Sequence, residues 1–437
     1  MAAARLYQRK WVLIKLPIAV AAVAVMAWLW TTWLPLPPST ITLSAGRADG
    51  VYHAYASRYA EAFARQGVTL KVLESEGSLQ NLQRLRGQAS PQADLAFMQG
   101  GIGYPPAERD TGARILTLSR VDIEPLWIFS RLAYVDGIQQ FQGLRVSLGP
   151  AGSGTRQLAL ALLDQVRLLP RDITDSELSG MAAVDALRQG TLDVMLMVSA
   201  PESRVVRALL STPGIHLVQL RRTAALTERL PYLQTRLLPQ GTLDGAHQPA
   251  RDVSVLTTSA SLVARADLHP ALQRLATQVA GGIHARGGVF HEPGEFPSLK
   301  RVEFPASEEA RRTLIHGLPW LEDRLPFWWA QIVMRLLVVC LPVALLAYWL
   351  ARMLPAYLRW LLESRVTRWY GELKYIEYDL TRDSLSGLDL TKYLDRLNSI
   401  ERRMADFVTP AYLMPRWFTL RQHIDFVRMG IFRRRGR

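Results

Sequence analysis

Residues 144–156 read LRVSLGPAGSGTR and join an apolar strand pattern, a turn rich in glycine and proline, and the start of a helix. Apolar residues alternate over 144–148, and they recur at helical spacing over 155–166. Residues 41–65 repeat this order, with a glycine-containing turn at 46–52 between a strand and a helix. Strand–turn–helix units of this kind predict an α/β domain.

The same alternation continues through residues 36–325. A stretch of about 290 residues exceeds one compact core, so we expect two α/β lobes. The patterns predict strands at 68–73, 94–98 and 194–198, an extended segment at 216–220, a strand beginning at 253, and helices at 78–86, 182–188, 204–210 and 270–279.

Charge is concentrated at the two ends of the 437-residue chain. The chain has a net charge of +14, yet residues 36–327 carry 30 basic and 28 acidic residues. A nearly neutral centre argues against nucleic acid as a partner, because nucleic-acid binding requires a basic patch on the folded domain. The single cysteine, Cys340, excludes a disulfide within the chain and a cysteine-based zinc site.

Two hydrophobic segments are long enough to cross a bilayer. Leu16–Leu34 contains no charged residue, and basic residues precede it. A cleaved signal peptide is the alternative, but the apolar run is long and no clean A-x-A site follows, which favours an uncleaved anchor. The second segment is Leu325–Met353, centred on Leu336–Ala351, in which we expect Pro342 to produce a kink.

The flanks of these segments predict their orientation. Basic residues precede the first segment, and Arg352, Arg359 and Arg365 follow the second, which favours the cytoplasm for both ends. Tryptophans crowd the ends of both segments, as in an aromatic belt. We therefore expect an anchor at 1–35, a periplasmic domain at 36–325, a second span at 326–354 and a cytoplasmic tail at 355–437.

The tail shows two amphipathic stripes, at 366–380 and 390–407. They predict an antiparallel helical hairpin, with a connection at 382–387, an end to the second helix at Pro410 and Pro415, and a third helix over 420–432. A small solvated bundle is one interpretation, and a docking surface for a partner is the other. The terminal arginines favour attraction to anionic membrane lipid.

The turn at Gly149–Thr155 superficially resembles a phosphate loop, but Thr155 stands where the loop requires lysine. A glycine-rich turn at a helix N-terminus still presents backbone N–H groups to a carboxylate or another small anion, although an ordinary helix cap has the same pattern. The eight histidines show no metal-ligand spacing, and no nucleophile elbow is present. We therefore expect no catalytic residue, metal or cofactor.

Four motifs occur in order along the first part of the chain: Ser44–His53, Glu74–Leu82, Asp94–Gln99 and Gly149–Thr155. Together they resemble the motifs of the TAXI-type solute-binding subunits associated with TRAP transporters. The C-terminal part, through 326–327, 368–373 and 420–424, resembles a membrane-anchored subgroup.

The resemblance implies a two-lobed, periplasmic-binding-protein-like (type II) domain that closes on a small organic anion by a hinge motion. It also implies TRAP-type permease subunits as partners and a location in the bacterial inner membrane. The residues that it places at the cleft are Gly50, Val51, Tyr52, Ser78, Gln99, Ser153, Gly154 and Thr155.

Two functions of different classes follow from these observations. The favoured one is a tethered solute receptor that delivers its ligand to a permease, since two spans are too few to form a transport path. The alternative is a sensor or assembly protein whose outer domain reports ligand state to the inner helices. The tail favours the alternative, because a soluble receptor does not need it.

Overall fold

The computed structural model describes residues 2–48, 50–103, 114–243, 248–382, 387–406, 409 and 411–435. The chain divides into two compact units. One unit is Leu36–Met334, and the other joins Met1–Pro35 to Arg335–Arg437.

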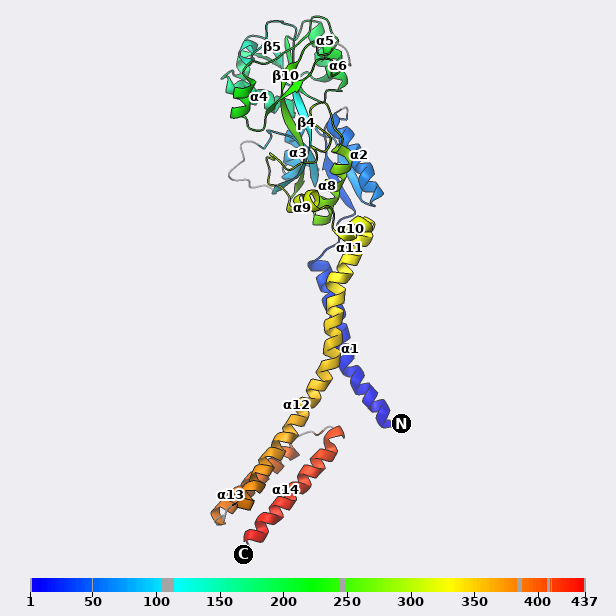
Figure 1. Cartoon of the computed structure of the whole chain (residues 1–437), viewed down its shortest axis with the longest axis vertical. Helices are drawn as coiled ribbons and strands as arrows, with labels where there is room; N and C mark the ends of the chain where they lie inside the picture. Colours follow the sequence, from blue (N-terminus) through cyan, green and yellow to red (C-terminus); the bar gives the residue numbers. More distant parts are fainter. Residues whose placement is uncertain are drawn as a thin grey trace. The chain divides into compact units, whose positions relative to one another are not determined.

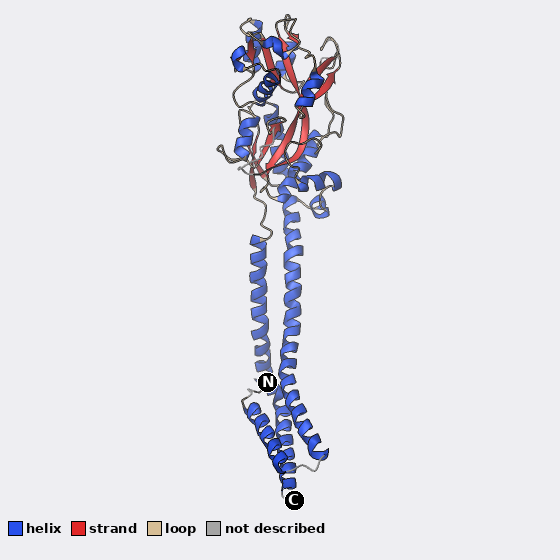
Figure 2. Ribbon diagram, turned by 90° about the vertical axis from the view of Figure 1, so that its left-hand side faces the viewer, coloured by secondary structure: helices blue, strands red, loops and turns tan. Residues whose placement is uncertain are grey.

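The first lobe of the larger unit is a parallel sheet with helices on both faces (Figure 2). Its strands are β1 (Thr40–Ser44), β2 (Thr69–Leu73) and β3 (Leu95–Gln99). Alternate residues of β3 face opposite cores, because successive side chains of a strand point to opposite sides. Phe97 packs with α2 (Val51–Arg65) and α8 (Pro270–His284), and Met98 packs with α3 (Ser78–Leu85).

The second lobe repeats this arrangement. Strand β5 (Arg145–Ser147) pairs in parallel with β6 (Thr174–Ser176) and β7 (Val194–Val198). The lobe has two apolar cores. Residues of α4 lie in one of them, and residues of α5 and α6 lie in the other together with Met195 of β7. The helices of the lobe are α4 (Gly154–Gln165), α5 (Gly180–Arg188), α6 (Arg204–Leu210) and α7 (Thr223–Arg229), with short 3₁₀ turns at Ile138–Phe141 and Pro170–Asp172.

Two long antiparallel strands, β4 (Ile115–Ser130) and β10 (Val253–Arg265), run through both lobes (Figure 1). The sheet order is β2-β1-β3-β10-β4-β7-β5-β6. Short strands β8 (His216–Leu217) and β9 (Gln234–Leu238) pair with β4 and β10. The α/β prediction is confirmed, but the sequence patterns identified only the start of β10 and missed β4.

The base of the first lobe is closed by α9 (Glu308–His316), α10 (Trp320–Arg324) and the start of α11 (Phe327–Arg335). The Arg274 guanidinium of α8 pairs with Glu309 at 2.5 Å and with Glu322 at 2.5 Å. Phe327 is buried in the lobe's core, and Trp328 Nε1 donates to the Gly67 carbonyl oxygen at 3.0 Å. The beginning of α11 is therefore an integral part of this lobe.

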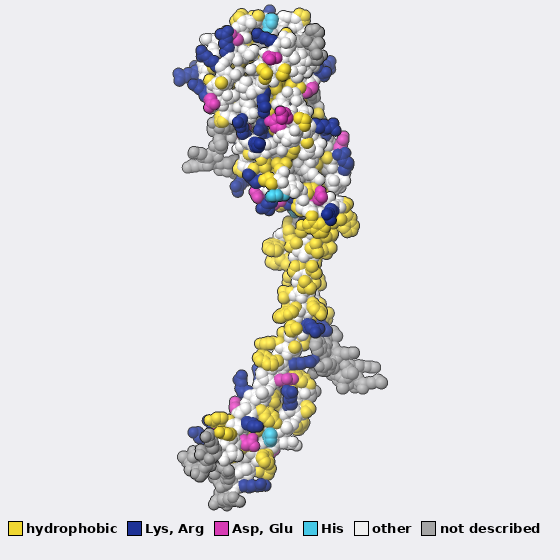
Figure 3. Space-filling view, viewed as in Figure 1, with side chains coloured by type: hydrophobic (Ala, Val, Ile, Leu, Met, Phe, Trp, Pro, Cys, Tyr) yellow, Lys and Arg dark blue, Asp and Glu magenta, His cyan; other side chains and the backbone are white. Residues whose placement is uncertain are grey.

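The second unit is helical. It contains α1 (Ala2–Thr32), a π-helical stretch at Leu336–Cys340, α12 (Leu341–Arg382), α13 (Gly387–Ala405), a 3₁₀ turn at Ala411–Leu413 and α14 (Met414–Arg435). Two stretches are long and apolar enough to cross a membrane, Lys15–Thr32 and part of Phe327–Thr381. Hydrophobic side chains cover the start of α12 (Figure 3).

The π-helical stretch has a local cause in the sequence. Pro342 lacks a backbone N–H, and its ring crowds the carbonyl group one turn before it. The stretch Leu336–Cys340 lies at that turn, where the i→i−4 bonding pattern is interrupted. The irregularity expected at Pro342 is thus a π-helical segment just before the proline.

Helices α12, α13 and α14 share one apolar core, which confirms the predicted helices of the tail. Pro415 lies in the first turn of α14, so the expectation that it ends the second helix is wrong. Proline suits that place because first-turn N–H groups have no partner within the helix. Residues 383–386 of the predicted connection and Pro410 lie outside the described residues. The core side chains are Val366, Trp369, Leu373, Ile376, Leu380, Leu397, Ile400, Met404, Leu413, Leu420, Ile424, Val427 and Ile431.

Asn81 of α3 holds the first lobe's sheet together from one side. Its side-chain amide donates to the Ala45 carbonyl oxygen at 2.6 Å and to the Phe97 carbonyl oxygen at 2.8 Å. Its Oδ1 accepts the Ser44 hydroxyl at 2.6 Å. Asn81 is fully buried, so each of these buried polar groups would lose a hydrogen bond without it, although the Ser44 hydroxyl oxygen also accepts the Arg84 guanidinium at 3.0 Å.

We predict that Asn81→Ala lowers the stability of the larger unit by about 3 kcal/mol, because it leaves buried polar groups without partners. For a domain of this size the midpoint of thermal unfolding should fall by roughly 6–12 °C. Gln83→Ala is the control, since Gln83 is exposed on the same helix and should change the midpoint little. Equal midpoints for the two variants would contradict the assigned role of Asn81.

Candidate ligand-binding site

Three helices begin where the two lobes meet. Helix α2 follows β1, α3 follows β2, and α4 follows β5, so each helix starts beyond the carboxyl end of a parallel strand. The N-cap residues are Gly50, Gly77 and Ser153. First-turn N–H groups lack acceptors within their own helix, and the helix dipole is positive at this end. The boundary between the lobes therefore offers many donors.

The lobes touch through glycine backbone. Gly77 has φ +139°, and a Cβ added there would lie 3.2 Å from Ser153 Cα and 3.3 Å from the Gly152 carbonyl oxygen. The N-terminus of α3 in the first lobe is thus packed directly on the turn that precedes α4 in the second. A larger residue at position 77 would separate the lobes or strain the backbone.

Gln99 forms the second contact between the lobes. It is the last residue of β3, its side chain is buried, and its Nε2 donates to the Gly154 carbonyl oxygen at 3.0 Å. A Cβ at Gly154 would lie 2.8 Å from Gln99 Cδ. Gly154 therefore admits the glutamine side chain, and these two residues, both predicted to lie at the cleft, are in direct contact.

The hydroxyls of Ser153 and Thr155 already have protein partners. Ser153 Oγ donates to the Pro150 carbonyl oxygen at 2.8 Å and accepts the Arg156 N–H at 3.2 Å, which is an ordinary helix cap. Thr155 Oγ1 accepts the Val198 N–H at 3.0 Å, so its own hydrogen remains available. We expected both hydroxyls to reach a ligand, but Ser153 has its donor engaged within the cap.

Arg156, a basic residue in the first turn of α4, is also engaged. Its guanidinium donates to the Gly149 carbonyl oxygen at 3.1 Å and pairs with Asp175 through two hydrogen bonds. These contacts fix the arginine within the second lobe. A ligand would have to displace Asp175 to use it.

Tyr52, Ser78 and Gln99 come together in the first lobe. Ser78 Oγ accepts the Gln99 backbone N–H at 2.9 Å, and the Ser78 and Tyr52 hydroxyls interact. The Tyr52 ring packs on Phe97 with centroids 5.6 Å apart. Gly50 and Val51 form the start of α2 beside Tyr52, and both are half-buried. The predicted residues of this lobe therefore gather around the N-termini of α2 and α3.

Two carboxyl groups on β4 complete this cluster. Tyr52 Oη donates to Glu124 Oε2 at 2.8 Å, and the Tyr55 hydroxyl donates to Asp122 Oδ2. His291 Nδ1 lies 3.5 Å from Asp122 Oδ1. Sequence reasoning missed all of these except Tyr52. The available signal was the spacing of Tyr52 and Tyr55, which places both rings on one face of a helix.

Burial shifts the protonation of this cluster. Desolvation raises the pKa of Glu124 to about 8, the hydrogen bond from Tyr52 lowers it in part, and the charge of Asp122 raises it further. Glu124 is therefore largely protonated at neutral pH. Desolvation also lowers the pKa of His284, whose ring contacts Tyr55, to about 3, so that histidine is neutral. The described residues contain no group of three or more His, Cys, Asp or Glu side chains able to hold a metal ion.

Comparison with known proteins gives a family match and distant structural likenesses. The profile of the NMT1-like family matches residues 43–279. A protein of Bordetella bronchiseptica has 17% identity, with 55% of this chain and 71% of that chain covered, at a TM-score of 0.38. The periplasmic aliphatic sulphonate binding protein of Escherichia coli has 16% identity, with 56% and 69% covered, at a TM-score of 0.35. These structures are too distant to indicate what this chain binds.

A third likeness is the alkanesulfonate-binding protein of Xanthomonas axonopodis pv. citri bound to MOPS. The two chains are 16% identical, and the match covers 56% of this chain and 75% of that chain at a TM-score of 0.33. This structure, too, is too distant to indicate what this chain binds.

We predict that Glu124 makes the stability of the larger unit dependent on pH. Its pKa of about 8 in the folded protein lies above the ordinary value of 4.5, so the folded state retains the proton more strongly. Stability should therefore fall as pH rises from about 4.5 to about 8, by a few kcal/mol in total. Glu124→Gln should remove most of this loss, as measured by thermal unfolding across that range.

Glu61→Gln serves as the control for this prediction, because Glu61 is exposed on α2. It should leave the pH dependence as it is in the unaltered protein. If Glu124→Gln and Glu61→Gln give the same pH profile, the protonated, buried state assigned to Glu124 is wrong.

Proposed function

This chain belongs to the NMT1-like family, and from that premise and the geometry of the lobe boundary we propose that it is a membrane-tethered solute-binding protein. The proposed ligand is a small organic anion, such as a carboxylate or an amino acid, held between the two lobes. The protein binds this ligand without transforming it chemically.

The observation that carries the proposal is the meeting of the helix N-termini. The starts of α3 and α4 are in direct contact, and α2 begins beside them. Each of these ends carries partial positive charge and N–H donors, which together favour an anion. Backbone N–H groups at Gly154 and Thr155 and the Thr155 hydroxyl supply donors from the second lobe. Tyr52, Ser78 and Gln99 supply polar groups from the first.

The acidic residues nearby are compatible with an anion. Glu124 is largely protonated at neutral pH, so it adds little negative charge and is able to donate a hydrogen bond. Asp122 is occupied by the Tyr55 hydroxyl and faces His291. Ionisation of Glu124 at higher pH would oppose an anion, so we expect binding to weaken as pH rises through about 8.

We further propose that the protein delivers its ligand to a TRAP-type permease in the bacterial inner membrane. The basic flanks of the two apolar stretches support cytoplasmic termini, with residues 36–325 in the periplasm. The motifs shared with TAXI-type subunits support the permease partner. Anionic lipid near the terminal arginines fits the same topology.

A second candidate function is favoured by the continuity of α12. This helix runs without interruption from the apolar stretch to the three-helix core. A receptor needs only an anchor, whereas a sensor needs a rigid element that joins the membrane segment to an inner domain. The alternative proposal is therefore a sensor or assembly protein whose outer domain controls the helices α12 to α14.

We predict that the full-length protein binds one or more small carboxylates, detected by thermal shift in a panel of organic acids. A ligand at a hundred times its dissociation constant should stabilise the fold by about 2.7 kcal/mol. Thr155→Val should weaken binding by roughly 10- to 100-fold, because a hydrogen bond to a charged group contributes about 1.5–3 kcal/mol.

Two variants act as controls for that prediction. Thr155→Ser keeps the hydroxyl and should retain affinity, whereas Ser153→Ala should lower stability by about 1 kcal/mol through loss of the cap. Affinity that is equal in Thr155→Val and Thr155→Ser would show that this hydroxyl does not hold the ligand.

We predict two membrane spans with both termini in the cytoplasm. Reporter fusions after residues 200 and 437 should report opposite compartments, since one span separates the two points. Reports from the same side would overturn the two-span topology, and a mature N-terminus near residue 40 would restore the signal-peptide interpretation.

A further inference from the structure

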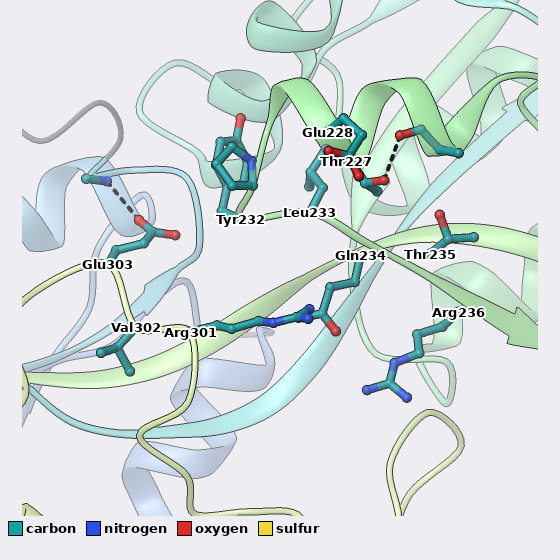
Figure 4. Close-up of a pocket in the computed structure, with 13 residues that line it drawn as sticks. Thr227, Glu228, Tyr232, Leu233, Gln234, Thr235, Arg236, Arg301, Val302 and Glu303 are labelled. Carbon is teal, nitrogen blue, oxygen red and sulfur yellow. Dashed lines mark hydrogen bonds between the residues drawn. The ribbon is translucent and has the colours of Figure 1, made fainter.

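A large cavity lies outside the residues assigned to the ligand. Its volume is about 960 Å³, which is within the range of small-molecule sites. Gly103 and residues 301–303 line it from the first lobe, where the adjoining Phe304 packs in the core beneath α3. Helix α7 and residues 231–236 line it from the second lobe (Figure 4). We refer to it as the Arg301 cavity.

Arg301 is unusual in conformation and in environment. Its φ is +53°, in the left-handed region that side chains other than Gly, Asn and Asp rarely adopt. The side chain extends over the cavity toward Gln234 (Figure 4). Among the described parts of the chain it has no hydrogen-bond or ion-pair partner. A strained residue that directs an uncompensated charge into a cavity is a recurrent feature of binding sites.

Three other charged side chains line the Arg301 cavity, one basic and two acidic. Arg236 also lines it and pairs with Glu295 at 3.0 Å. Glu303, a carboxylate in the wall, is engaged by the backbone N–H groups of Gly101 and Gly103. Glu228 on α7 is the one other acidic lining residue in the described chain, and it is exposed. Among the described residues, Arg301 is therefore the basic side chain of the lining that has no ion-pair partner, and Glu228 is its acidic counterpart.

The remaining wall is amphipathic. Pro231, Leu233 and Val302 are apolar, while the Tyr232 ring packs on Gly101, where an added Cβ would lie 2.5 Å from it. Gln234 and Thr235 add hydrogen-bonding groups. This combination suits a ligand with one anionic group and one apolar group.

We propose that the Arg301 cavity is a second ligand site, which binds a small organic anion with its carboxylate or sulfonate on Arg301 and its apolar part against residues 231–233. This site is separate from the helix N-termini and does not depend on the function proposed for them. Because its walls belong to both lobes, an occupant bridges the lobes.

The test uses 4-fluorophenylacetate as the probe, followed by ¹⁹F NMR line broadening with the full-length protein. Arg301→Asn removes the charge while keeping a residue that tolerates the left-handed conformation. It should raise the dissociation constant of the probe at least about tenfold, and Arg301→Lys should recover part of the affinity. Glu228→Gln should lower the dissociation constant by about two- to threefold, because it removes from the wall a negative charge that repels the anionic probe.

The matched control is Arg167→Asn. Arg167 is another exposed arginine, with φ +58°, that does not line the Arg301 cavity. Arg167→Asn should therefore leave probe binding unchanged. Equal affinity in Arg301→Asn and Arg167→Asn would overturn the proposal, as would the absence of broadening with the unaltered protein at millimolar probe.

Thr155→Val separates this proposal from the proposed function. If Thr155→Val weakens probe binding and Arg301→Asn does not, the probe occupies the helix N-termini and the second site is refuted. If Arg301→Asn weakens binding while the organic-acid panel and Thr155→Val show no effect, the second site stands and the proposed function fails.

Discussion

The contact between the N-termini of α3 and α4 constrains the whole larger unit. Each terminus carries roughly half a positive charge, so their close approach is electrostatically unfavourable unless something negative compensates it. Gly77 and Gly154 make the approach sterically feasible, and the Gln99 amide bridges it through the Gly154 carbonyl group. The same arrangement that strains the contact electrostatically makes it receptive to an anion.

Strand β4, which runs through both lobes, is linked by hydrogen bonds to the start of α2 beside this contact. Its carboxyl groups at Asp122 and Glu124 accept hydrogen bonds from Tyr55 and Tyr52, so the start of α2 is fixed to a strand that runs through both lobes. Any change in the angle between the lobes must accommodate these bonds. The raised pKa of Glu124 keeps this region from becoming strongly negative at neutral pH. Lobe geometry and the protonation of Glu124 are therefore coupled through a few residues.

The sequence predicted the local elements of this region well, since helices that follow short apolar strands have clear periodicity. Helix 204–210 and strand 194–198 agree with the structure to the residue. Strand β4 was missed because Arg120, Asp122 and Glu124 interrupt its apolar pattern and its 16 residues exceed an ordinary strand. Two of these polar residues, Asp122 and Glu124, accept the hydrogen bonds that hold the start of α2, so the residues that hid the strand also link it to the first lobe.

Other features required the tertiary structure. The pattern predicts that Ser153 lies at a helix N-terminus, but only its contacts show that the hydroxyl is engaged in the cap. Asn81 lies within the motif Glu74–Leu82, but only its three hydrogen bonds in the structure reveal its role as a buried link between β1 and β3. The conformation of Arg301 and the cavity around it depend on a loop far from α7 in sequence, which no local pattern indicates.

A ligand held between the lobes, as proposed, requires them to close about β4 and β10, and the distance between the lobes tests this most directly. Spin labels at Gln88→Cys in the first lobe and Arg171→Cys in the second, both exposed positions, would report this distance by pulsed electron paramagnetic resonance once Cys340 is replaced by serine. With a saturating ligand from the organic-acid panel, we expect a single narrow distribution of label distances centred at a short distance. Without ligand, the distribution should be broader and centred at a longer distance. A distribution that is identical with and without a ligand known to bind would contradict closure of the lobes as the basis of binding.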